Sequence, residues 1–364
     1  MQIGIVGLPN SGKTTIFNAL TRGEAETTAY ASGTMEVHTA VVDVPDERVD
    51  KLSEIFRPRR TIYAKVQYND IGGVTKGIGS SGGMSGQLLN RMSQNDALLL
   101  VIRAFENELV PHPEGSVDPV RDVEVVQTEF LLSDMSLMDN RLKRIEERLK
   151  KGGDPKERAA YREEKELLLR LQAVLEEEKP LRGIELSPEE EKILRAFGLL
   201  TLKPLLIVVN AGDEGYDLPD ELAALNDQPE TAVMVLQGKV EMELSQMDPD
   251  EAAEFLDAFG IEEPGLNRVI KKSYELLGLQ SFFTVGEDEV RAWTVRKGAT
   301  ALEAAAAIHT DLARGFIRAE VVHYEDLMAC DGSMAEARKR GLLRLEGKEY
   351  VVQDGDIVHI RFNV

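Results

Sequence analysis

Short apolar runs separated by polar, helix-like stretches mark the first part of the chain. Residues 2–7 (QIGIVG) are β-branched and end at a glycine, a pattern typical of a buried strand. The next stretch places Ile16, Phe17 and Leu20 at helical spacing. Because such apolar runs alternate with helical stretches, we predict an α/β fold with a mostly parallel sheet covered on both faces. The further runs that predict strands lie near residues 39–44, 61–68, 97–103, 205–209 and 231–236.

Residues 121–200 have a different pattern, dense in Glu, Lys, Arg and Leu. From Leu131 to Leu149 the apolar positions form a heptad seam, and a matching stripe runs from Tyr161 to Leu175. The GGDP sequence at 152–155 predicts the end of one helix and the start of the next. We therefore predict an antiparallel helical hairpin inserted between two strands of the sheet. It forms either a protruding arm or an ordinary amphipathic pair folded onto the domain.

From about residue 281 the pattern changes again to alternating, strand-like runs. They surround residues 301–316 (ALEAAAAIHTDLARGF), which read as one amphipathic helix. This order predicts a small mixed domain with one helix over a curved sheet. The glycine-rich residues 72–86 predict a mobile loop.

Composition limits the possible functions of the chain. Its 364 residues suggest two or three domains, and its formal charge of −21 excludes a broad electrostatic grip on nucleic acid or on an anionic membrane. We expect no sequence-specific DNA binding and no membrane span, because no apolar run approaches the roughly 20 residues that a span needs. The single cysteine, Cys330, and a start without a secretion signal predict a soluble, cytoplasmic protein.

The loop after the first predicted strand has the pattern of a P-loop. Glycines allow its backbone amides to face phosphate oxygens, and the following helix adds a positive dipole. Lys13 is expected to bridge the β- and γ-phosphates, and the Thr14 hydroxyl to ligate Mg²⁺. A tight turn without a ligand would not explain a lysine after the second glycine. The sequence therefore predicts binding of a nucleoside triphosphate at Gly7-Leu8-Pro9-Asn10-Ser11-Gly12-Lys13-Thr14.

A DxxG sequence, from Asp70 to Gly73, ends the strand predicted at 61–68. Its carboxylate can hold the magnesium through water, and its glycine can sense the γ-phosphate. Val74 stands where many GTPases place a water-orienting glutamine, so hydrolysis needs another group or is slow. Thr34 is a candidate second hydroxyl ligand for Mg²⁺.

Two polar segments follow the strands at 205–209 and 231–236 and predict a pocket for the base. Asp213, in Asn210-Ala-Gly-Asp213, can accept hydrogen bonds from guanine N1–H and N2–H₂, whereas adenine offers one donor on that edge. Gly238, between Gln237 and Lys239, can complete the pocket with its backbone N–H. These residue types leave the choice between adenine and guanine open.

Taken together, these segments resemble the YchF/Obg-like ATPase family of translation-factor-class P-loop proteins. The resemblance spans nearly the whole chain, through GIVGLPNSGKTTIFNALT, DIGGVTKG, LLTLKPLLIVVN, EEPGLNRVIKKSYELLGLQSFFTVGEDEVRAWTV and KEYVVQDGDIVHIRFNV. It implies a Ras-like P-loop domain in residues 1–120 and 201–280. It also implies an inserted coiled-coil hairpin in residues 121–200 and a C-terminal β-grasp (TGS) domain in residues 281–364.

The family resemblance implies binding and hydrolysis of ATP, often in preference to GTP, and association with ribosomes. It implies a base contact through the backbone of Ala211 and a water-positioning role for His112. Val74 falls where the family also has a hydrophobic residue, and Thr14 and Thr34 fall on the Mg²⁺ ligands. The residues implied to hold the phosphates are Asn10, Ser11, Gly12, Lys13, Thr14 and Thr15.

The chain departs from the family at two places that bear on function. Asp213 stands where the family has glutamate, which leaves the adenine preference open, and Gly33 replaces a family cysteine, which removes redox control there. Our leading hypothesis is a slow regulatory ATPase that acts as a nucleotide-dependent switch on the ribosome. The alternatives are a docking module with vestigial hydrolysis and a GTP-specific switch. A small-molecule kinase is disfavoured because Thr34, DxxG and NxxD form a switch set.

Overall fold

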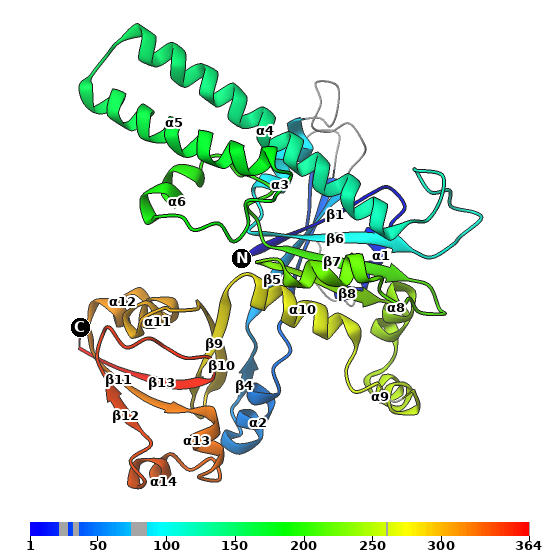
Figure 1. Ribbon diagram of the computed structural model, residues 1–364. Coiled ribbons are helices and arrows are strands. Elements are labelled where there is room, and N and C mark those ends of the chain that lie inside the picture. The colour runs from blue at the N-terminus through cyan, green and yellow to red at the C-terminus, as the bar shows by residue number, and fades with distance from the viewer. Residues whose placement is uncertain (22–27, 32–35, 74–85, 260, 364) are drawn as a thin grey trace. The chain divides into compact units, whose positions relative to one another are not determined.

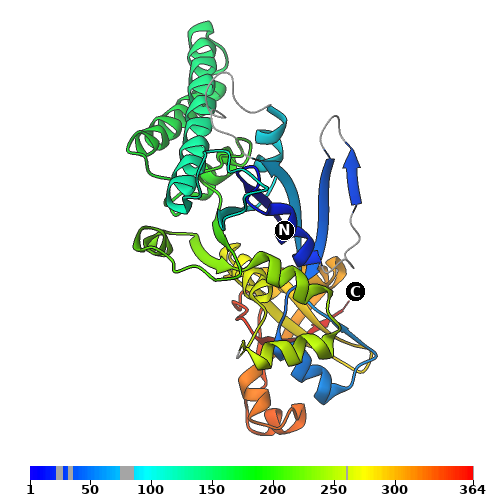
Figure 2. The same cartoon turned by 90° about the vertical axis from the view of Figure 1, so that its right-hand side faces the viewer.

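The computed structural model describes residues 1–21, 28–31, 36–73, 86–259 and 261–363. These residues form two compact units, Met1–Val41 with Gln67–Val269 and Val42–Val66 with Ile270–Val364. Each unit is built around a sheet (Figures 1 and 2). Residues 42–66, which the sequence suggested for the nucleotide-binding part, lie in the second unit.

The first unit holds a seven-stranded sheet in the order β2-β3-β5-β1-β6-β7-β8. Neighbouring strands along β5-β1-β6-β7-β8 run parallel, while β2 and β3 are antiparallel, which confirms the predicted mostly parallel sheet. The central strands β6 and β7 are buried along almost their whole length, because both faces of the sheet are covered. The strands are β1 (Gln2–Gly7), β2 (Thr28–Ala31), β3 (Glu36–Asp43), β5 (Lys65–Gly73), β6 (Ala97–Ala104), β7 (Leu205–Ala211) and β8 (Thr231–Leu236).

Helices cover this sheet with apolar side chains. One face packs against α3 (Gly86–Ser93), the first turns of α4 (Pro119–Lys151) and α7 (Asp220–Ala223), through residues such as Met92, Phe130 and Leu222. On the same strands the alternate positions are also buried, so the other face is covered as well. The remaining elements of this part of the chain are α1 (Lys13–Thr21), a 3₁₀ turn (Ala224–Asp227), α8 (Gly238–Gln246), α9 (Pro249–Ala258) and α10 (Gly265–Leu276), which continues into the second unit.

The predicted helical hairpin is present and projects as an arm (Figure 1). Helix α4 ends at Lys151 and α5 (Pro155–Glu176) begins at the predicted proline, with the Asp154 side chain capping its first turn. The far half of α4 leaves the sheet and packs with α5 and α6 (Pro188–Leu194) around a separate apolar cluster. With 33 residues, α4 is about 50 Å long, so one helix joins the sheet core to the arm.

The second unit holds a six-stranded sheet in the order β12-β11-β13-β9-β10-β4. Three alanines of α11 (Ala301–Ile308) lie in its core, and their small side chains allow the helix to approach the strands closely. The strands are β4 (Arg60–Ile62), β9 (Leu279–Val285), β10 (Glu289–Arg296), β11 (Phe316–His323), β12 (Arg344–Glu346) and β13 (Asp356–Phe362). The other helices are α2 (Glu47–Phe56), α12 (Thr310–Arg314), α13 (Tyr324–Met328) and α14 (Met334–Lys339).

Two elements differ from the sequence prediction. The single strand expected at 61–68 is two strands, β4 in the second sheet and β5 in the first. The single helix expected at 301–316 is divided at His309, whose backbone is extended at φ −164°. There the His309 ring accepts a hydrogen bond from the Asp311 amide and caps α12. No helix within the described ranges is long and apolar enough to cross a membrane.

Candidate functional site

The loop from β1 to α1 has the backbone conformation that only its glycines allow. Gly12 has φ +92°, and a Cβ there would lie 2.2 Å from the Asn210 side-chain nitrogen. At Gly7, with φ +156°, a Cβ would lie 2.3 Å from the Val101 carbonyl oxygen. Asn10 has φ +64°, a left-handed conformation that asparagine tolerates better than most residues. The turn thus curls tightly against neighbouring strands and leads directly into the N-terminus of α1.

Lys13, the first residue of α1, is a buried cation inside this loop. Its Nζ donates a hydrogen bond to the Leu8 carbonyl, 2.7 Å away. Burial lowers the pKa of Lys13 to about 8, and the negative charge of Asp70 opposes that shift. A bound anion would compensate the buried ammonium, so the loop favours a negatively charged ligand.

Two oxygen-bearing side chains lie together beside the loop and could hold a metal. The Thr14 hydroxyl lies 3.3 Å from Asp70 Oδ2. Asp70 precedes the last residues of β5, where Gly73 pairs with Gly7 of β1. Hydroxyl and carboxylate oxygens are hard donors of the kind Mg²⁺ prefers. Among the residues that the structure describes, no group of three His, Cys, Asp or Glu side chains is arranged as a metal cluster.

Two buried polar atoms of this region have no hydrogen-bond partner within the described part of the chain, Ser11 Oγ and Asp70 Oδ1. Buried polar atoms are normally paired, because leaving them unpaired costs free energy. Their position at the P-loop therefore favours a site that a ligand completes. Thr34 and Val74, the other predicted switch residues, lie outside the described residues.

The two segments expected around the base meet at the carboxyl ends of β7 and β8. Asn210 joins them to the P-loop, since its Nδ2 donates to the Ser11 carbonyl at 3.0 Å and its Oδ1 accepts from the Gly238 amide at 3.1 Å. Gln237 Nε2 donates to the carbonyl of Asp213 at 2.9 Å. The Asp213 carboxylate is exposed and lies 3.4 Å from Lys239 Nζ. Through these two hydrogen bonds, Asn210 links the P-loop to the expected base pocket.

His112 lies in the loop between β6 and α4, and its ring is buried. Its Nε2 is 2.8 Å from Asp122 Oδ2, and its Nδ1 accepts a hydrogen bond from the Glu114 amide at 3.2 Å. Arg121 pairs with the other oxygen of Asp122 at 2.8 Å. In this conformation both ring nitrogens face groups of their own loop and of α4.

The sequence analysis missed the contacts that fix this loop beside the site. Buried Arg103 donates to the carbonyls of Phe105 and Val110, each at 2.9 Å. Asn10 Nδ2 donates to the Pro111 carbonyl at 3.1 Å and so joins the P-loop to the residue before His112. An arginine inside the apolar run ALLLVIRA was the signal for such a role, because a buried guanidinium must find acceptors.

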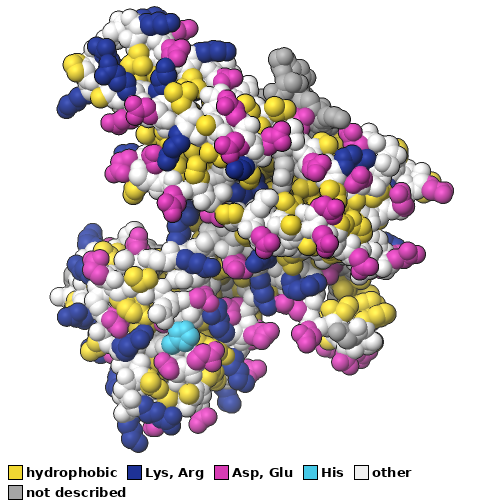
Figure 3. All heavy atoms as spheres, viewed as in Figure 1, with side chains coloured by type: hydrophobic (Ala, Val, Ile, Leu, Met, Phe, Trp, Pro, Cys, Tyr) yellow, Lys and Arg dark blue, Asp and Glu magenta, His cyan; other side chains and the backbone are white. Residues whose placement is uncertain are grey.

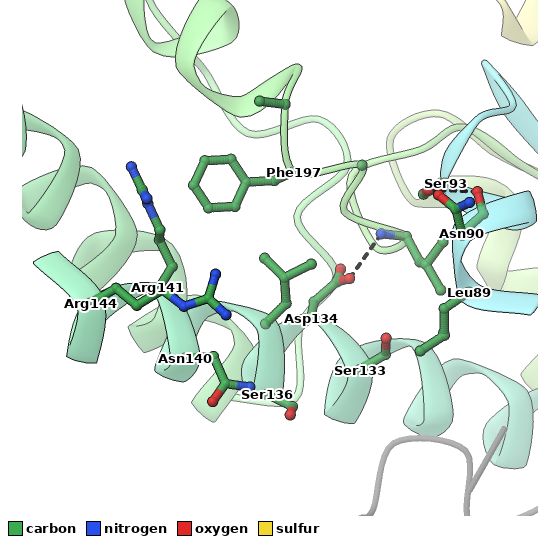
Figure 4. Close-up of a pocket in the computed structure, with 14 residues that line it drawn as sticks. Leu89, Asn90, Ser93, Ser133, Asp134, Ser136, Asn140, Arg141, Arg144 and Phe197 are labelled. Atoms are coloured by element: carbon green, nitrogen blue, oxygen red, sulfur yellow. Dashed lines mark hydrogen bonds between the residues drawn. The ribbon is translucent and has the colours of Figure 1, made fainter. Parts of the chain in front are cut away.

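A pocket of about 730 Å³ lies at the base of the arm, between the end of α3, α4 and residues 196–200 (Figure 4). Asp134 is buried at its wall and accepts hydrogen bonds from the Leu200 amide at 2.9 Å and from the Thr201 amide and hydroxyl at 2.8 and 2.7 Å. Burial raises the pKa of Asp134 to about 6, although these donors and the charge of Lys203 lower it. The carboxylate thus fastens the arm to the segment that leads into β7.

Comparisons with known proteins identify both ends of the chain. The family model MMR_HSR1, described as "50S ribosome-binding GTPase", matches residues 2–138. The model YchF-GTPase_C, described as "Protein of unknown function (DUF933)", matches residues 279–363.

Full-length relatives agree with these matches. The "Ribosome-binding ATPase YchF" of Bacillus subtilis is 42% identical over 370 residues, covering all of both chains. The protein of the same name from Haemophilus influenzae is 41% identical and covers 100% of this chain and 99% of its own. The solved structure of the Schizosaccharomyces pombe YchF GTPase has a TM-score of 0.84 at 32% identity, covering 99% of this chain and 97% of that one.

Proposed function

The chain belongs to the YchF family of P-loop nucleoside triphosphatases, and on this premise we propose that it is a slow ATPase that acts on the ribosome as a nucleotide-dependent switch. The observation that carries the proposal is the loop from Gly7 to Thr14, which holds a buried lysine at the start of a helix, with a pKa that burial lowers more than Asp70 raises it. The relatives' name supplies the ribosome as partner, and ribosome association implies the cytoplasm as the place of action.

In the proposed site the phosphates lie along the amides from Asn10 to Thr15. The Lys13 ammonium leaves the Leu8 carbonyl for the β- and γ-phosphates, which provide stronger acceptors for a buried charge. Asn210 holds the Ser11 carbonyl and therefore keeps the loop in shape before the nucleotide arrives. This preorganisation reduces the entropy that binding must overcome.

We assign Mg²⁺ to the oxygens of Thr14 and Asp70, with Thr34 as a further ligand. The 3.3 Å approach of the first two side chains and the unpaired Asp70 Oδ1 support that assignment. When bound, Mg²⁺ neutralises charge on the transferred phosphoryl group.

For His112 we propose that it positions the attacking water. The contact with Asp122 supports the proposal, because a carboxylate fixes the imidazole tautomer and its orientation. The step requires the loop around Pro111 to carry the ring toward the phosphates, and the Asn10–Pro111 hydrogen bond connects the two loops.

GTP is the second candidate substrate, favoured by one residue. The Asp213 carboxylate is exposed beside the base pocket and can accept two hydrogen bonds from guanine. We propose that Ala211 contacts the base through its backbone and that Gly238 closes the pocket. The test is a titration of ATP against GTP with the wild type and Asp213→Glu. ATP is expected to bind more tightly to the wild type, and its margin over GTP is expected to widen in the variant.

We further propose that each part of the chain has its own role. Within residues 1–120 and 201–280, we assign nucleotide binding to those of the first unit, 1–41, 67–120 and 201–269. Residues 121–200 form the arm, and residues 281–364 form a TGS domain. The arm and the TGS domain report the nucleotide state to the ribosome. Helix α4 supports the proposal for the arm, because one helix runs from the core of the sheet to the hairpin.

Hydrolysis measured with and without ribosomes tests the proposed function. Lys13→Ala is expected to abolish turnover of MgATP and His112→Ala to lower it, while Lys51→Ala, an exposed lysine of α2 paired with Glu54, leaves it unchanged. Equal turnover in the wild type and Lys13→Ala would contradict the proposed site. Equal turnover in His112→Ala would contradict only the role of that histidine. Absence of any stimulation by ribosomes would favour a docking module with vestigial hydrolysis.

A further inference from the structure

Helix α9 is amphipathic, but its apolar side does not enter a core. Ala252, Phe255, Leu256 and Phe259 recur at the i, i+3, i+4 and i+7 spacing of a single helix face. Phe259 nevertheless has 67% of its surface exposed, and Ile261 has 38%. Among the described residues between Leu244 and Leu266, no hydrophobic side chain is fully buried.

The apolar face is ordered without support from a core. Asp248 caps the helix by accepting a hydrogen bond from the Asp250 amide at 3.2 Å. At the other end the Ile261 amide donates to the Leu256 carbonyl at 2.9 Å, which folds Ile261 back toward the helix. The rings of Phe255 and Phe259 lie 4.5 Å apart and form one apolar surface. A preformed apolar surface with an exposed aromatic side chain, Phe259, beside a half-buried one, Phe255, is typical of an interaction site.

The segment that carries this face has charged side chains of one sign only. Residues 247–263 contain seven Asp and Glu and no Lys, Arg or His. Figure 3 shows hydrophobic side chains gathered on one side of α9 with acidic side chains beside them. An RNA backbone would be repelled by this rim, and a second copy of the same helix would bring a second acidic rim against it. A basic protein surface with an apolar groove complements both the charge and the aromatic anchors.

We propose that α9 docks, as a helix in a groove, onto a basic protein component of the ribosome and not onto its RNA. The inference rests on the proposed association with ribosomes and assigns one contact within it. Phe255 and Phe259 supply the anchors, and the acidic rim selects the partner and fixes the orientation.

Two substitutions in α9 test the proposal by ribosome co-sedimentation. Phe259→Ser removes the most exposed anchor and is expected to weaken binding at least tenfold, as loss of an aromatic anchor does. The control is Val41→Ser, a change to serine at an exposed hydrophobic residue of β3, which lies outside the arm and the TGS domain. Glu254→Lys replaces a negative charge with a positive one and so distinguishes the two kinds of partner. We expect it to weaken binding to a basic protein and to strengthen binding to RNA. Turnover of MgATP without ribosomes is expected to be unchanged in all three variants, which shows that they fold.

A photo-crosslinking amino acid in place of Phe259 identifies the partner directly. Crosslinks to a basic ribosomal protein support the proposal, whereas crosslinks to RNA or to a second copy of this chain overturn it. Unchanged affinity of Phe259→Ser beside a wild type that binds ribosomes overturns the docking helix alone. A wild type that does not sediment with ribosomes overturns the proposed association and this inference with it.

Discussion

Removal of the Asp134 carboxylate is expected to loosen the attachment of the arm. Asp134→Ala leaves the Leu200 and Thr201 amides and the Thr201 hydroxyl without their acceptor. A hydroxyl can rotate to another partner more freely than a backbone amide can, so the two buried amides dominate the cost. At about 1–3 kcal/mol for each unsatisfied buried donor, the free energy of unfolding is expected to fall by about 3 kcal/mol.

Two measurements check this expectation. Urea unfolding followed by circular dichroism at 222 nm gives the change in free energy, and hydrogen exchange over residues 196–202 gives the local effect. Ser136→Ala is the control, because Ser136 lines the same pocket on α4. Loss of protection at Leu200 and Thr201 is expected in Asp134→Ala only. A variant within about 0.5 kcal/mol of the wild type, with these amides still protected, would refute the reasoning.

Three further predictions concern titration, the P-loop and the loop after β6. Because burial raises the Asp134 pKa to about 6, the folded state binds the extra proton between about pH 4 and 6. The free energy of unfolding should therefore fall by about 3 kcal/mol as the pH rises from about 4 to 6. Urea titrations at each pH measure this slope, which Asp134→Asn should lack. Gly12→Ala forces a Cβ against Asn210 and is expected to weaken binding of a fluorescent ATP analogue by about 10- to 100-fold, whereas Gly286→Ala, with ordinary space for a Cβ, leaves it intact. Arg103→Met frees the Phe105 and Val110 carbonyls, so chymotrypsin should cleave after exposed Leu109 faster than in the wild type; equal rates would contradict the anchoring role.

Local signals in the sequence predicted much of this fold, including the turn between β1 and α1 on which the proposed site is built. The P-loop glycines, the GGDP break and the apolar strands act over a few residues, so their outcome can be read from the chain itself. The division of residues 60–73 between two sheets depends on pairing with β10 and with β1, which lie far away in sequence. For the same reason the sequence could not show that Asp134 holds amides 66 and 67 residues later.

The sequence also could not show which side chains contact one another at the site. The family resemblance pointed to His112, but its contact with Asp122 depends on how the loop turns into α4. Asn210 was expected beside the base, but its hydrogen bond to the Ser11 carbonyl requires β7 and the P-loop to lie side by side. Residue types thus indicated the chemistry, whereas long-range geometry determined which atoms meet.

The second unit is discontinuous in sequence, and this affects how the protein folds during its synthesis. Residues 42–66 leave the translating machinery about two hundred residues before Ile270, where the rest of their unit begins. At about 5–20 residues per second, they wait on the order of 10–40 s for the strands that will complete their sheet. During that interval apolar side chains such as Val49 and Leu52 have no complete core in which to be buried. The nascent chain is therefore most open to chaperone binding, proteolysis and misassembly at this stage.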